Sequence, residues 1–428
     1  MKQVRPYPQV IVTRKAARAL AAGHPWVFEG EVIRMEAAPT DGYAATNGCV
    51  VDVFEENGTW QGAGLLSGQS KIRVRIVTRN ANDRIDEAFW RRKLEWAWRH
   101  RVTCMGSRSA AACGERPDTD SCRVLFSEAD GFPGLIVDRY EQVLVAQVGT
   151  VGMELLRPTL YPLLLDVLRA DGQDVRAIYE RNDAPTREKE GLPLYKGWWD
   201  GAEALDTRIV VHENALAFSL DLENSQKTGF FLDQKYNRRA VRDIAFGRRV
   251  LDCFCHVGPF GLNAVAGGAE FVRCVDVSQV AIDLARENAR LNGMEANMGF
   301  TCANVLDYLP ELRRDRTLLR EEGGPFDLIV LDPPAFTKSR GTVRNATRGY
   351  RQINCDAMRL LPRGGYLATC SCSQHMTRDL LAQAIAEAAH DANVQLKQIE
   401  ERQQAPDHPI LWGVPETHYL DFFIFQVV

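Results

Sequence analysis

The chain has 428 residues, 25% of them charged, and a formal net charge of −4, so it carries no global basic field. This length suits two or three domains, each with its own core. No apolar run approaches the roughly 18 residues of a membrane span, and the basic N-terminus lacks the apolar core and cleavage site of a signal peptide. We therefore expect a soluble cytoplasmic protein without a membrane partner, in which a polyanion would need a local basic patch.

Residues 1–80 alternate short strand-like runs with glycines, and one helical stretch, "RKAARALAAG", interrupts them. This pattern of short strands and glycines predicts a small β-barrel-like module. The segment holds ten Lys and Arg against seven Asp and Glu, although the chain as a whole is acidic. Such an asymmetry favours a polyanionic partner for this module.

Residues 83–200 show helix, strand, helix and strand patterns, with the turn "ADGFPG" between two strands, and predict a small α+β domain. The polar run "NDAPTREKEGLP" ends it as a linker. Cys104, Cys113 and Cys122 fall in "CMGSRSAAACGERPDTDSC", which is typical of an exposed insertion loop. Their spacing matches no zinc pattern, so we expect no metal there, and no function for these cysteines follows from the sequence.

From residue 205 to 428, strands and helices alternate. This alternation predicts an α/β, Rossmann-like domain with a mainly parallel sheet covered on both faces. Ligands of such sheets bind at the carboxyl ends of the strands, where the strand order reverses. The motifs that follow all fall at predicted strand ends.

The first motif, "LDCFCHVGPFGL", contains Asp252, Phe254 and Gly258, and a glycine in such a turn lets a ligand approach the backbone. Asp276 ends the next strand, where a carboxylate suits the two hydroxyls of a ribose. The G-x-G-x-x-G that seats a pyrophosphate is absent. These features favour an adenosine cofactor without phosphates, and S-adenosylmethionine (SAM) meets that description.

Three further residues are candidates for the cofactor pocket. Asn304, in "CANV", either accepts a hydrogen bond from the adenine amino group or simply forms a turn. Phe231 and Gln234 lie in "QKTGFFLDQKYNRR", just before a predicted helix. Paired aromatic residues such as those in "GFFL" are more often part of a core, so this assignment is a hypothesis.

"LDPPAF" follows a strongly apolar strand and places Asp332 at the strand tip, facing the expected methyl group. The two prolines make the loop rigid. Phe336 offers a flat face on which a nucleobase could stack. Lys338 and Arg340 follow at once and could hold a phosphate. The alternative is a plain structural loop.

"TCSCS" contains two cysteines, Cys370 and Cys372. Carbon 5 of a pyrimidine is a poor nucleophile until a thiolate adds to carbon 6, and cysteine is the side chain suited to that addition. Cys370 lies within the strand pattern "YLATC" and should be buried and inert. Cys372 lies past the strand end, so we predict that Cys372 is the nucleophile and Asp332 its catalytic neighbour.

The sequence resembles the class I rRNA large-subunit methyltransferases that make 5-methylcytosine, which carry an N-terminal PUA domain and a small central α+β domain. The matching stretches are "HPWVFEGEV" (24–32), "SEADGFPGLIVDRY" (127–140), "KTGFFLDQKYNRR" (227–239), "LDCFCHVGPFGL" (251–262), "VDVS" (275–278), "LDPPAF" (331–336) and "CSCS" (370–373). The resemblance implies that Asp252, Gly258, Asp276 and Asp332 shape the SAM pocket and that Cys372 is the nucleophile. It also implies that the first domain binds RNA.

The sequence departs from the family pattern at several places, one of which is the unusual insertion at 103–122. An acid is usual where Asn304 stands, and a histidine is common where Gln226 stands. Related RNA methyltransferases carry a second cysteine in the proline motif, and this chain has none there. The group that removes the carbon 5 proton is therefore open between Asp332 and a water molecule.

We expect the first domain to bind RNA, and large-subunit rRNA in particular, through Arg14, Lys15 and the "HPW" turn with Trp26. The sequence leaves the oligomeric state open, with a homodimer as one option. It also leaves two other functions open. One is an exocyclic-amine methyltransferase, because "DPPAF" resembles the motifs of those enzymes; the other is a non-catalytic RNA-binding protein, against which Asp276 and Cys372 both argue.

Overall fold

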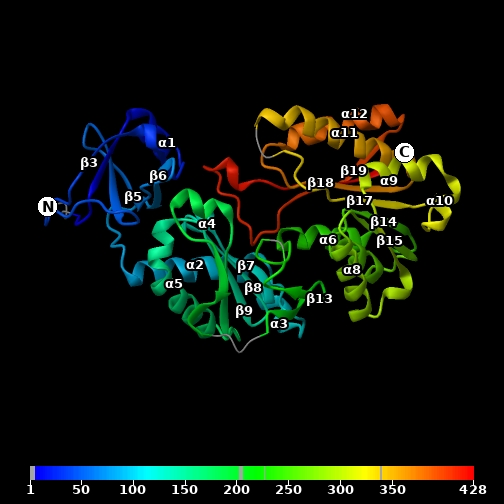
Figure 1. The fold of residues 1–428 in the computed structure, drawn as a ribbon, viewed down its shortest axis with the longest axis horizontal. Coiled ribbons are helices and arrows are strands. Elements are labelled where there is room, and N and C mark those ends of the chain that lie inside the picture. Colours follow the sequence, from blue (N-terminus) through cyan, green and yellow to red (C-terminus); the bar gives the residue numbers. More distant parts are fainter. Residues whose placement is uncertain (1–4, 202–205, 226, 338–339) are drawn as a thin grey trace. The chain divides into compact units, whose positions relative to one another are not determined.

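The computed structural model describes residues 5–201, 206–225, 227–337 and 340–428 (Figure 1). The chain divides into two units. Unit 1 comprises Met1–Val211, Leu220–Leu232 and Pro406–Thr417, and unit 2 comprises His212–Ser219, Asp233–Ala405 and His418–Val428. Within the described ranges, no helix is both long and apolar enough to cross a bilayer.

Unit 1 begins with a six-stranded sheet in the order β2-β6-β5-β4-β1-β3. Its elements are β1 (Gln9–Val12), α1 (Arg14–Ala21), β2 (Trp26–Phe28), η1 (Glu29–Glu31), β3 (Val32–Glu36), β4 (Val50–Glu55), β5 (Trp60–Leu66) and β6 (Ile72–Thr78). The Thr13 hydroxyl accepts a hydrogen bond from the Ala16 N–H and so caps α1. This sheet with one helix confirms the predicted N-terminal β domain.

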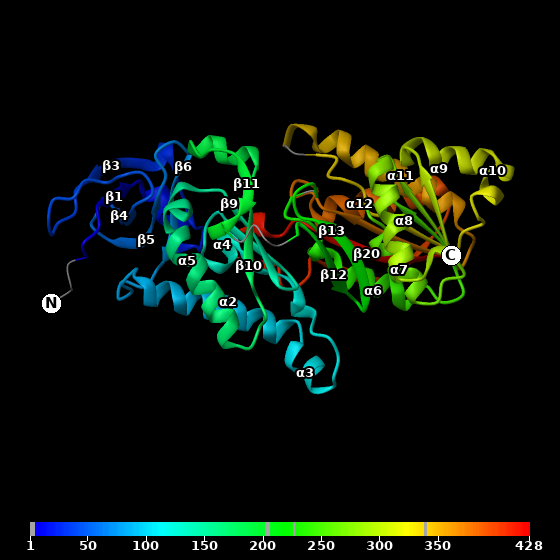
Figure 2. The same cartoon turned by 60° about the horizontal axis from the view of Figure 1, so that its bottom comes forward.

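A second, five-stranded sheet follows in the order β11-β10-β9-β8-β7, with α2 and α5 packed together beside it (Figure 2). Its elements are α2 (Glu87–Cys104), α3 (Ser107–Ala112), η2 (Asp118–Asp120), β7 (Ser121–Phe126), α4 (Ser127–Asp130), β8 (Leu135–Tyr140), β9 (Val143–Val148), α5 (Val151–Ala170), β10 (Ala177–Asn182), η3 (Pro185–Glu190), β11 (Tyr195–Trp198) and η4 (Trp199–Gly201). Helices and a mixed sheet share one apolar core, as expected for an α+β domain.

The predicted insertion loop is partly wrong. The stretch contains the end of α2, the short α3 and the start of β7. Cys104 and Cys113 are exposed as expected, but Cys122 is fully buried in β7 because its strand lies in the core of the five-stranded sheet. No cluster of three or more metal-binding side chains occurs among the described residues.

Unit 2 contains a seven-stranded sheet in the order β16-β15-β14-β17-β18-β20-β19. Its strands are β14 (Arg249–Cys253), β15 (Phe271–Asp276), β16 (Met298–Cys302), β17 (Leu328–Leu331), β18 (Tyr366–Ser371), β19 (Leu396–Gln403) and β20 (Asp421–Val427). Neighbours from β16 to β18 pair in parallel, and β20 runs antiparallel to both β18 and β19. The parallel sheet confirms the predicted α/β class, whereas the reversed β20 was not predicted.

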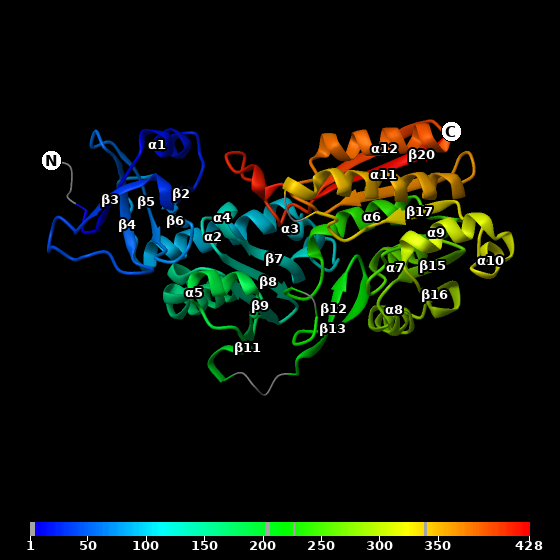
Figure 3. The same ribbon diagram turned by 45° about the horizontal axis from the view of Figure 1, so that its top comes forward.

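Helices cover both faces of this sheet (Figures 1 and 3). They are α6 (Lys235–Asp243), α7 (Pro259–Ala266), α8 (Gln279–Leu291), α9 (Val305–Arg314), α10 (Arg316–Glu321), α11 (Val343–Leu360) and α12 (Arg378–Ala392), with η5 (Leu232–Gln234), η6 (Glu295–Asn297) and η7 (Arg340–Thr342) as short turns, whereas η8 (Pro415–Thr417) belongs to unit 1. One apolar cluster joins α9, α11 and α12 to the sheet, while α7 and α8 lie on the opposite face. A hairpin of β12 (Arg208–Glu213) and β13 (Leu216–Asp221) precedes the domain.

Candidate active site at the carboxyl ends of the parallel strands

The carboxyl ends of the parallel strands bring the predicted residues to one edge of unit 2. Asp252 lies near the end of β14, Asp276 ends β15, and Asn304 follows β16. Asp332 directly follows β17, and Cys372 directly follows β18. The strand order reverses between β14 and β17, which is the place where ligands bind in open parallel sheets.

The turn between β14 and α7 has an unusual backbone. Phe254, His256 and Gly258 have φ of +60°, +50° and +83°. At Gly258 a Cβ atom would also lie 3.2 Å from the Ala285 Cβ of α8, so the turn requires glycine for both conformation and space. The half-buried Asp276 carboxylate holds this turn, because it accepts the His256 N–H at 3.0 Å.

Asp252 is completely buried beneath the same turn. One of its carboxylate oxygens accepts the Gly261 N–H at 2.8 Å, and the other has no hydrogen-bond partner among the described residues. Burial, reinforced by the negative charges of Asp332 and Asp276, raises the pKa of Asp252 to about 8. Asp252 therefore fixes the start of α7 and holds an unsatisfied oxygen at the strand ends.

Asp332 belongs to a small network at the tip of β17. Its Oδ1 accepts the Cys370 thiol at 3.0 Å and the Gln234 Nε2 at 3.1 Å. The Gln234 amide is itself buried and accepts the Asn237 side chain at 2.6 Å. Burial raises the pKa of Asp332 to about 6, although the bond from Cys370 opposes that shift. The carboxylate thus titrates near neutral pH.

The two cysteines of "TCSCS" differ in their surroundings. Cys370 is fully buried, and burial next to Asp332 raises the pKa of its thiol well above the usual value. Cys372 is half-buried, and its thiol donates to the Pro333 carbonyl at 3.7 Å. Cys372 therefore lies against the "DPPAF" loop, whereas Cys370 is held in a hydrogen-bonded interior.

The "DPPAF" loop packs on α11. The Phe336 ring lies 4.8 Å from the Tyr350 ring, and a Cβ atom at Gly349 would come within 3.0 Å of Phe336. One side of the Phe336 ring is thus occupied by contacts with α11. The Ser373 hydroxyl donates to the Thr337 carbonyl at 2.9 Å and ties this loop to the one that carries Cys372. The predicted Lys338 lies outside the described residues.

Other residues at this edge escaped the sequence analysis. Val277 directly follows β15 and Leu306 lies in the first turn of α9; they expose 72% and 45% of their surface, so they offer apolar contacts near the strand ends. Asn304 caps α9, since its Oδ1 accepts the Leu306 N–H at 3.2 Å and its Nδ2 donates to Asp307. The signal that could have identified Val277 is its position directly after the strand-end acid.

Two arginines of α11 were also missed. Arg344 and Arg348 are exposed, lie one turn apart and, among the described residues, form no ion pair or side-chain hydrogen bond. Arg351 on the same helix is paired with Glu387 and Asp391 of α12. The contact of Gly349 with Phe336 places this turn of α11 beside the "DPPAF" loop.

The remaining predicted residues belong to unit 1. Phe231 is half-buried, with the Lys227 ammonium 5.1 Å from its ring centre. Arg14 and Lys15 are exposed in the first turn of α1. The Trp26 indole N–H donates to Glu128 at 3.0 Å, so the polar end of this side chain already has a partner.

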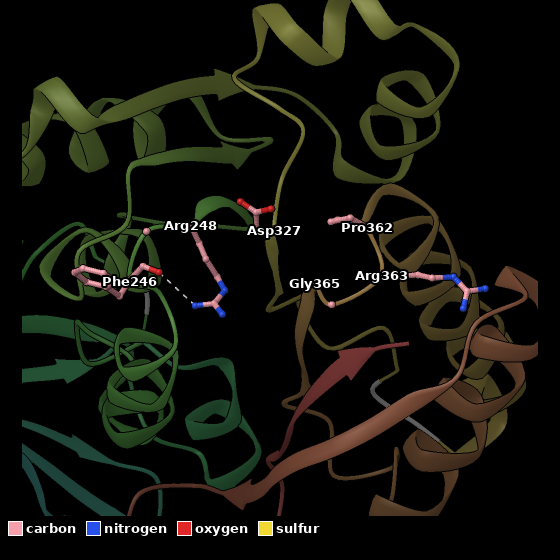
Figure 4. Close-up of a pocket in the computed structure, with 8 residues that line it drawn as sticks. Phe246, Arg248, Asp327, Pro362, Arg363 and Gly365 are labelled. Carbon is pink, nitrogen blue, oxygen red and sulfur yellow. Dashed lines mark hydrogen bonds between the residues drawn. The ribbon is translucent and has the colours of Figure 1, made fainter.

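A pocket of about 370 Å³ lies elsewhere, at the edge where β14, β17 and β18 begin (Figure 4). It is lined by Phe246, Arg248, Asp327 and Arg363 together with a glycine-rich turn. The Arg248 guanidinium lies 4.5 Å from the Tyr366 ring centre. The pocket contains no nucleophile and lies at the opposite ends of the strands, so the strand-end residues define the candidate active site.

Comparisons with known proteins agree with this geometry. A family model for S-adenosylmethionine-dependent methyltransferases matches residues 192–416, and a PUA-like domain model matches residues 10–79. The ribosomal RNA large subunit methyltransferase I of Klebsiella pneumoniae is 36% identical over 99% of both chains, and that of Shewanella amazonensis is 37% identical over 96% of this chain and 97% of its own.

Solved structures share the fold. A candidate SAM-dependent methyltransferase from Streptococcus mutans aligns with a TM-score of 0.75 at 18% identity over 98% of this chain and 100% of its own. A structure complexed with SAH aligns with a TM-score of 0.76 at 17% identity and the same coverage.

The parallel sheet, its strand-end acids and the N-terminal β domain define a class I methyltransferase joined to a PUA-like domain. The chain belongs to the S-adenosylmethionine-dependent methyltransferase family that includes these ribosomal RNA large subunit methyltransferases I. The expected cofactor, SAM, is the methyl donor of this family.

Proposed function

We propose that this protein methylates carbon 5 of a cytosine in large-subunit rRNA through a Cys372 thiolate. The observation that carries the proposal is the contrast between the two cysteines: Cys370 is buried and bonded to Asp332, whereas Cys372 lies past the strand end against Pro333. The names of the full-length relatives support rRNA as the substrate. An rRNA substrate also supports a cytoplasmic location, and a homodimer stays a prediction.

The strand-end residues suit SAM. The Gly258 turn gives close access to the backbone, Asp276 presents a carboxylate for ribose hydroxyls, and the unsatisfied oxygen of buried Asp252 provides a further polar group. Val277 and Leu306 offer apolar contacts for an adenine ring. When bound, SAM supplies an electrophilic methyl group on a sulfonium.

In the proposed mechanism, the Cys372 thiolate adds to carbon 6 of the cytosine and makes carbon 5 nucleophilic. After carbon 5 is methylated, its proton must leave, and the bond between the Cys372 sulfur and carbon 6 then breaks to restore the thiolate. Asp332 is our candidate for the proton acceptor because its pKa of about 6 suits a base at neutral pH. Its bond from Cys370 keeps the carboxylate oriented.

Two surfaces are proposed to hold the RNA backbone. Arg344 and Arg348 lie beside the "DPPAF" loop without acidic partners among the described residues, so their charge is available to phosphates near the target base. Arg14 and Lys15 serve the same role on the PUA-like domain. Phe336 is proposed to stack on the target base, which has to leave its own stack.

The direct test of the function is mass mapping of modified bases in rRNA from cells that lack the protein. The proposal expects one large-subunit cytosine to lose its 5-methyl group and to regain it when the intact gene is restored, but not when Cys372→Ala is supplied. A fully modified rRNA, or a missing methyl group on an exocyclic nitrogen instead, would contradict it.

A further inference from the structure

Pro406–Thr417, the segment of unit 1 between β19 and β20, is firmly held. The Asp407 carboxylate accepts the Arg123 N–H at 2.8 Å, and the Asp407 carbonyl accepts the Arg101 guanidinium at 2.8 Å. The Thr417 hydroxyl donates to the Val414 carbonyl at 2.7 Å and accepts the Leu411 N–H at 2.9 Å. The backbone on either side of residue 412 is thus fixed by hydrogen bonds.

Trp412 projects from this fixed backbone and is 96% exposed. Tryptophan carries the largest apolar surface of any side chain and is highly buried on average, so its complete exposure on an ordered segment calls for a partner. Trp96, on α2 of the same unit, is 57% exposed and has the Arg92 guanidinium 5.5 Å from its ring centre. Trp412 is therefore the more exposed of the two.

The segment packs on the turn that leads into β2 of the PUA-like domain. A Cβ atom at Gly413 would lie 3.0 Å from the Gly23 backbone, so the two glycines allow the two chain segments to touch. The turn continues into His24 and Trp26, whose ring centres are 5.3 Å apart. The Arg79 guanidinium donates to the His24 carbonyl at 2.9 Å.

The charges near this contact come mainly from the PUA-like side. Arg18, in the last turn of α1, is exposed and forms no ion pair or side-chain hydrogen bond among the described residues. Arg79 bonds a carbonyl rather than an acid. The segment itself adds one exposed acid, Glu416. Exposed aromatic faces next to cations are the usual composition of a single-stranded nucleic acid surface.

We propose that Trp412 is a stacking platform for an unpaired nucleobase of the RNA substrate, continuous with the RNA surface of the PUA-like domain. This inference rests on the proposed function. Stacking on an aromatic side chain is sequence-tolerant and works best on bases that are not paired. The occupant is thus a single-stranded stretch of the rRNA outside the target nucleotide.

The test compares Trp412→Ala, Trp412→Phe and Trp96→Ala in the full-length protein, with large-subunit rRNA as the probe. A stacking loss of about 1–3 kcal/mol per base raises the Kd for rRNA about 5-fold to 150-fold in Trp412→Ala. Trp412→Phe retains most of the affinity because a flat ring remains. Trp96→Ala retains all of it. The salt dependence of Kd stays unchanged in every variant, because no phosphate contact is lost.

An equal Kd for Trp412→Ala and wild type would overturn the assignment, and so would a weaker Kd accompanied by weaker SAM binding, which would mark a structural role. If binding to protein-free rRNA is unchanged and only methylation of assembled ribosomal particles falls, Trp412 contacts a protein and the assignment also fails. Wild-type protein that binds no rRNA would refute the proposed function itself, whereas normal wild-type binding with an unaffected variant refutes only the role of Trp412.

Discussion

The five-stranded sheet of unit 1 and the strand ends of unit 2 both contain ionisable residues removed from solvent. The two regions differ in whether these residues have ion-pair partners. In unit 1, Arg101 binds both oxygens of Asp130 at 2.6 and 2.7 Å, and Arg123 binds both oxygens of Asp138 at 2.8 and 2.9 Å. In unit 2, Asp252 is fully buried and Asp332 half-buried, neither has an ion-pair partner among the described residues, and desolvation raises the pKa of each.

We interpret this difference as one between charges that support the fold and carboxyl groups that are proposed to act at the active site. A carboxylate whose two oxygens both accept hydrogen bonds from one arginine supports a single packing arrangement. A carboxyl group that is buried without a cation lowers the stability of the fold at neutral pH. Such groups concentrate at active sites. In our proposal the strand ends of unit 2 give up stability for the proposed chemistry, and the following variants test that distinction.

The largest expected effect is on catalysis at the strand ends. Cys372→Ala removes the proposed nucleophile and should lower kcat by more than about 10⁴-fold while SAM binding persists. Cys370→Ala is the matched control, since its thiol lies inside β18 and only supports Asp332; most activity should remain. Single-turnover methylation of rRNA measures both, and equal losses in the two variants would contradict the assignment.

Breaking a paired charge of unit 1 should act on stability instead. Arg101→Met leaves Asp130 buried without its cation and should lower the free energy of unfolding by about 3–5 kcal/mol. At temperatures where the variant is folded, its affinity for SAM should equal that of the wild type. Denaturant unfolding measures the stability and calorimetric titration measures the SAM affinity. A reduced SAM affinity in the folded variant would contradict a purely structural role for this ion pair.

Asp332 should set the acidic limb of the pH profile. Its raised pKa of about 6 means that the carboxyl group gains a proton as the pH falls through that value, so it can no longer accept one. We expect kcat to decrease below pH 6 in the wild type. Asp332→Asn should lower kcat by about a hundredfold and abolish this limb. An unchanged limb in the variant would assign it to another group.

A substitution of Asp276 tests the proposed SAM contact at the strand ends. Asp276→Ala should weaken SAM binding by about 1.5–3 kcal/mol, the value of a charge-assisted hydrogen bond. The variant also loses the bond to the His256 N–H, so circular dichroism must show that it is folded. If the folded variant binds SAM as tightly as the wild type, Asp276 does not contact the ribose.

The smallest effect concerns the arginines of α11. Arg344→Gln and Arg348→Gln should each weaken rRNA binding and lower the slope of log Kd against log salt by about 0.7–0.9, the value of one phosphate contact. Arg351→Gln is the matched control, because Arg351 already binds Glu387 and Asp391. A reduced slope in the control alone would move the RNA surface elsewhere on the helix.

The sequence predicts where the candidate residues lie better than it predicts their hydrogen-bond partners. Strand periodicity alone puts Asp276, Asp332 and Cys372 at one edge, because the ends of parallel strands meet there. The bond between Asp332 and Cys370 depends on the order in which β17 and β18 pair, and that order follows from the tertiary fold. The exposure of Trp412 equally depends on contacts made by its segment with distant elements.

The local signals also failed where tertiary burial overrides them. The polar stretch before Cys122 predicts an exposed loop, yet the cysteine is buried because β7 pairs with β8 inside a core. Asn304 is exposed, and its side chain caps α9, which agrees with the turn-forming interpretation and leaves its contact with adenine a prediction. Both outcomes depend on the element that comes next in the chain.

The most direct test of the central claim uses rRNA that carries 5-fluorocytosine at the target position. Carbon 5 then has no removable proton, so the Cys372 adduct cannot be released after methylation. The account predicts a denaturant-resistant protein–RNA complex that requires SAM, forms with Cys370→Ala and is absent with Cys372→Ala. Full methylation of ordinary rRNA by Cys372→Ala, with the methyl group on an exocyclic nitrogen, would contradict the thiolate mechanism and identify an amine methyltransferase.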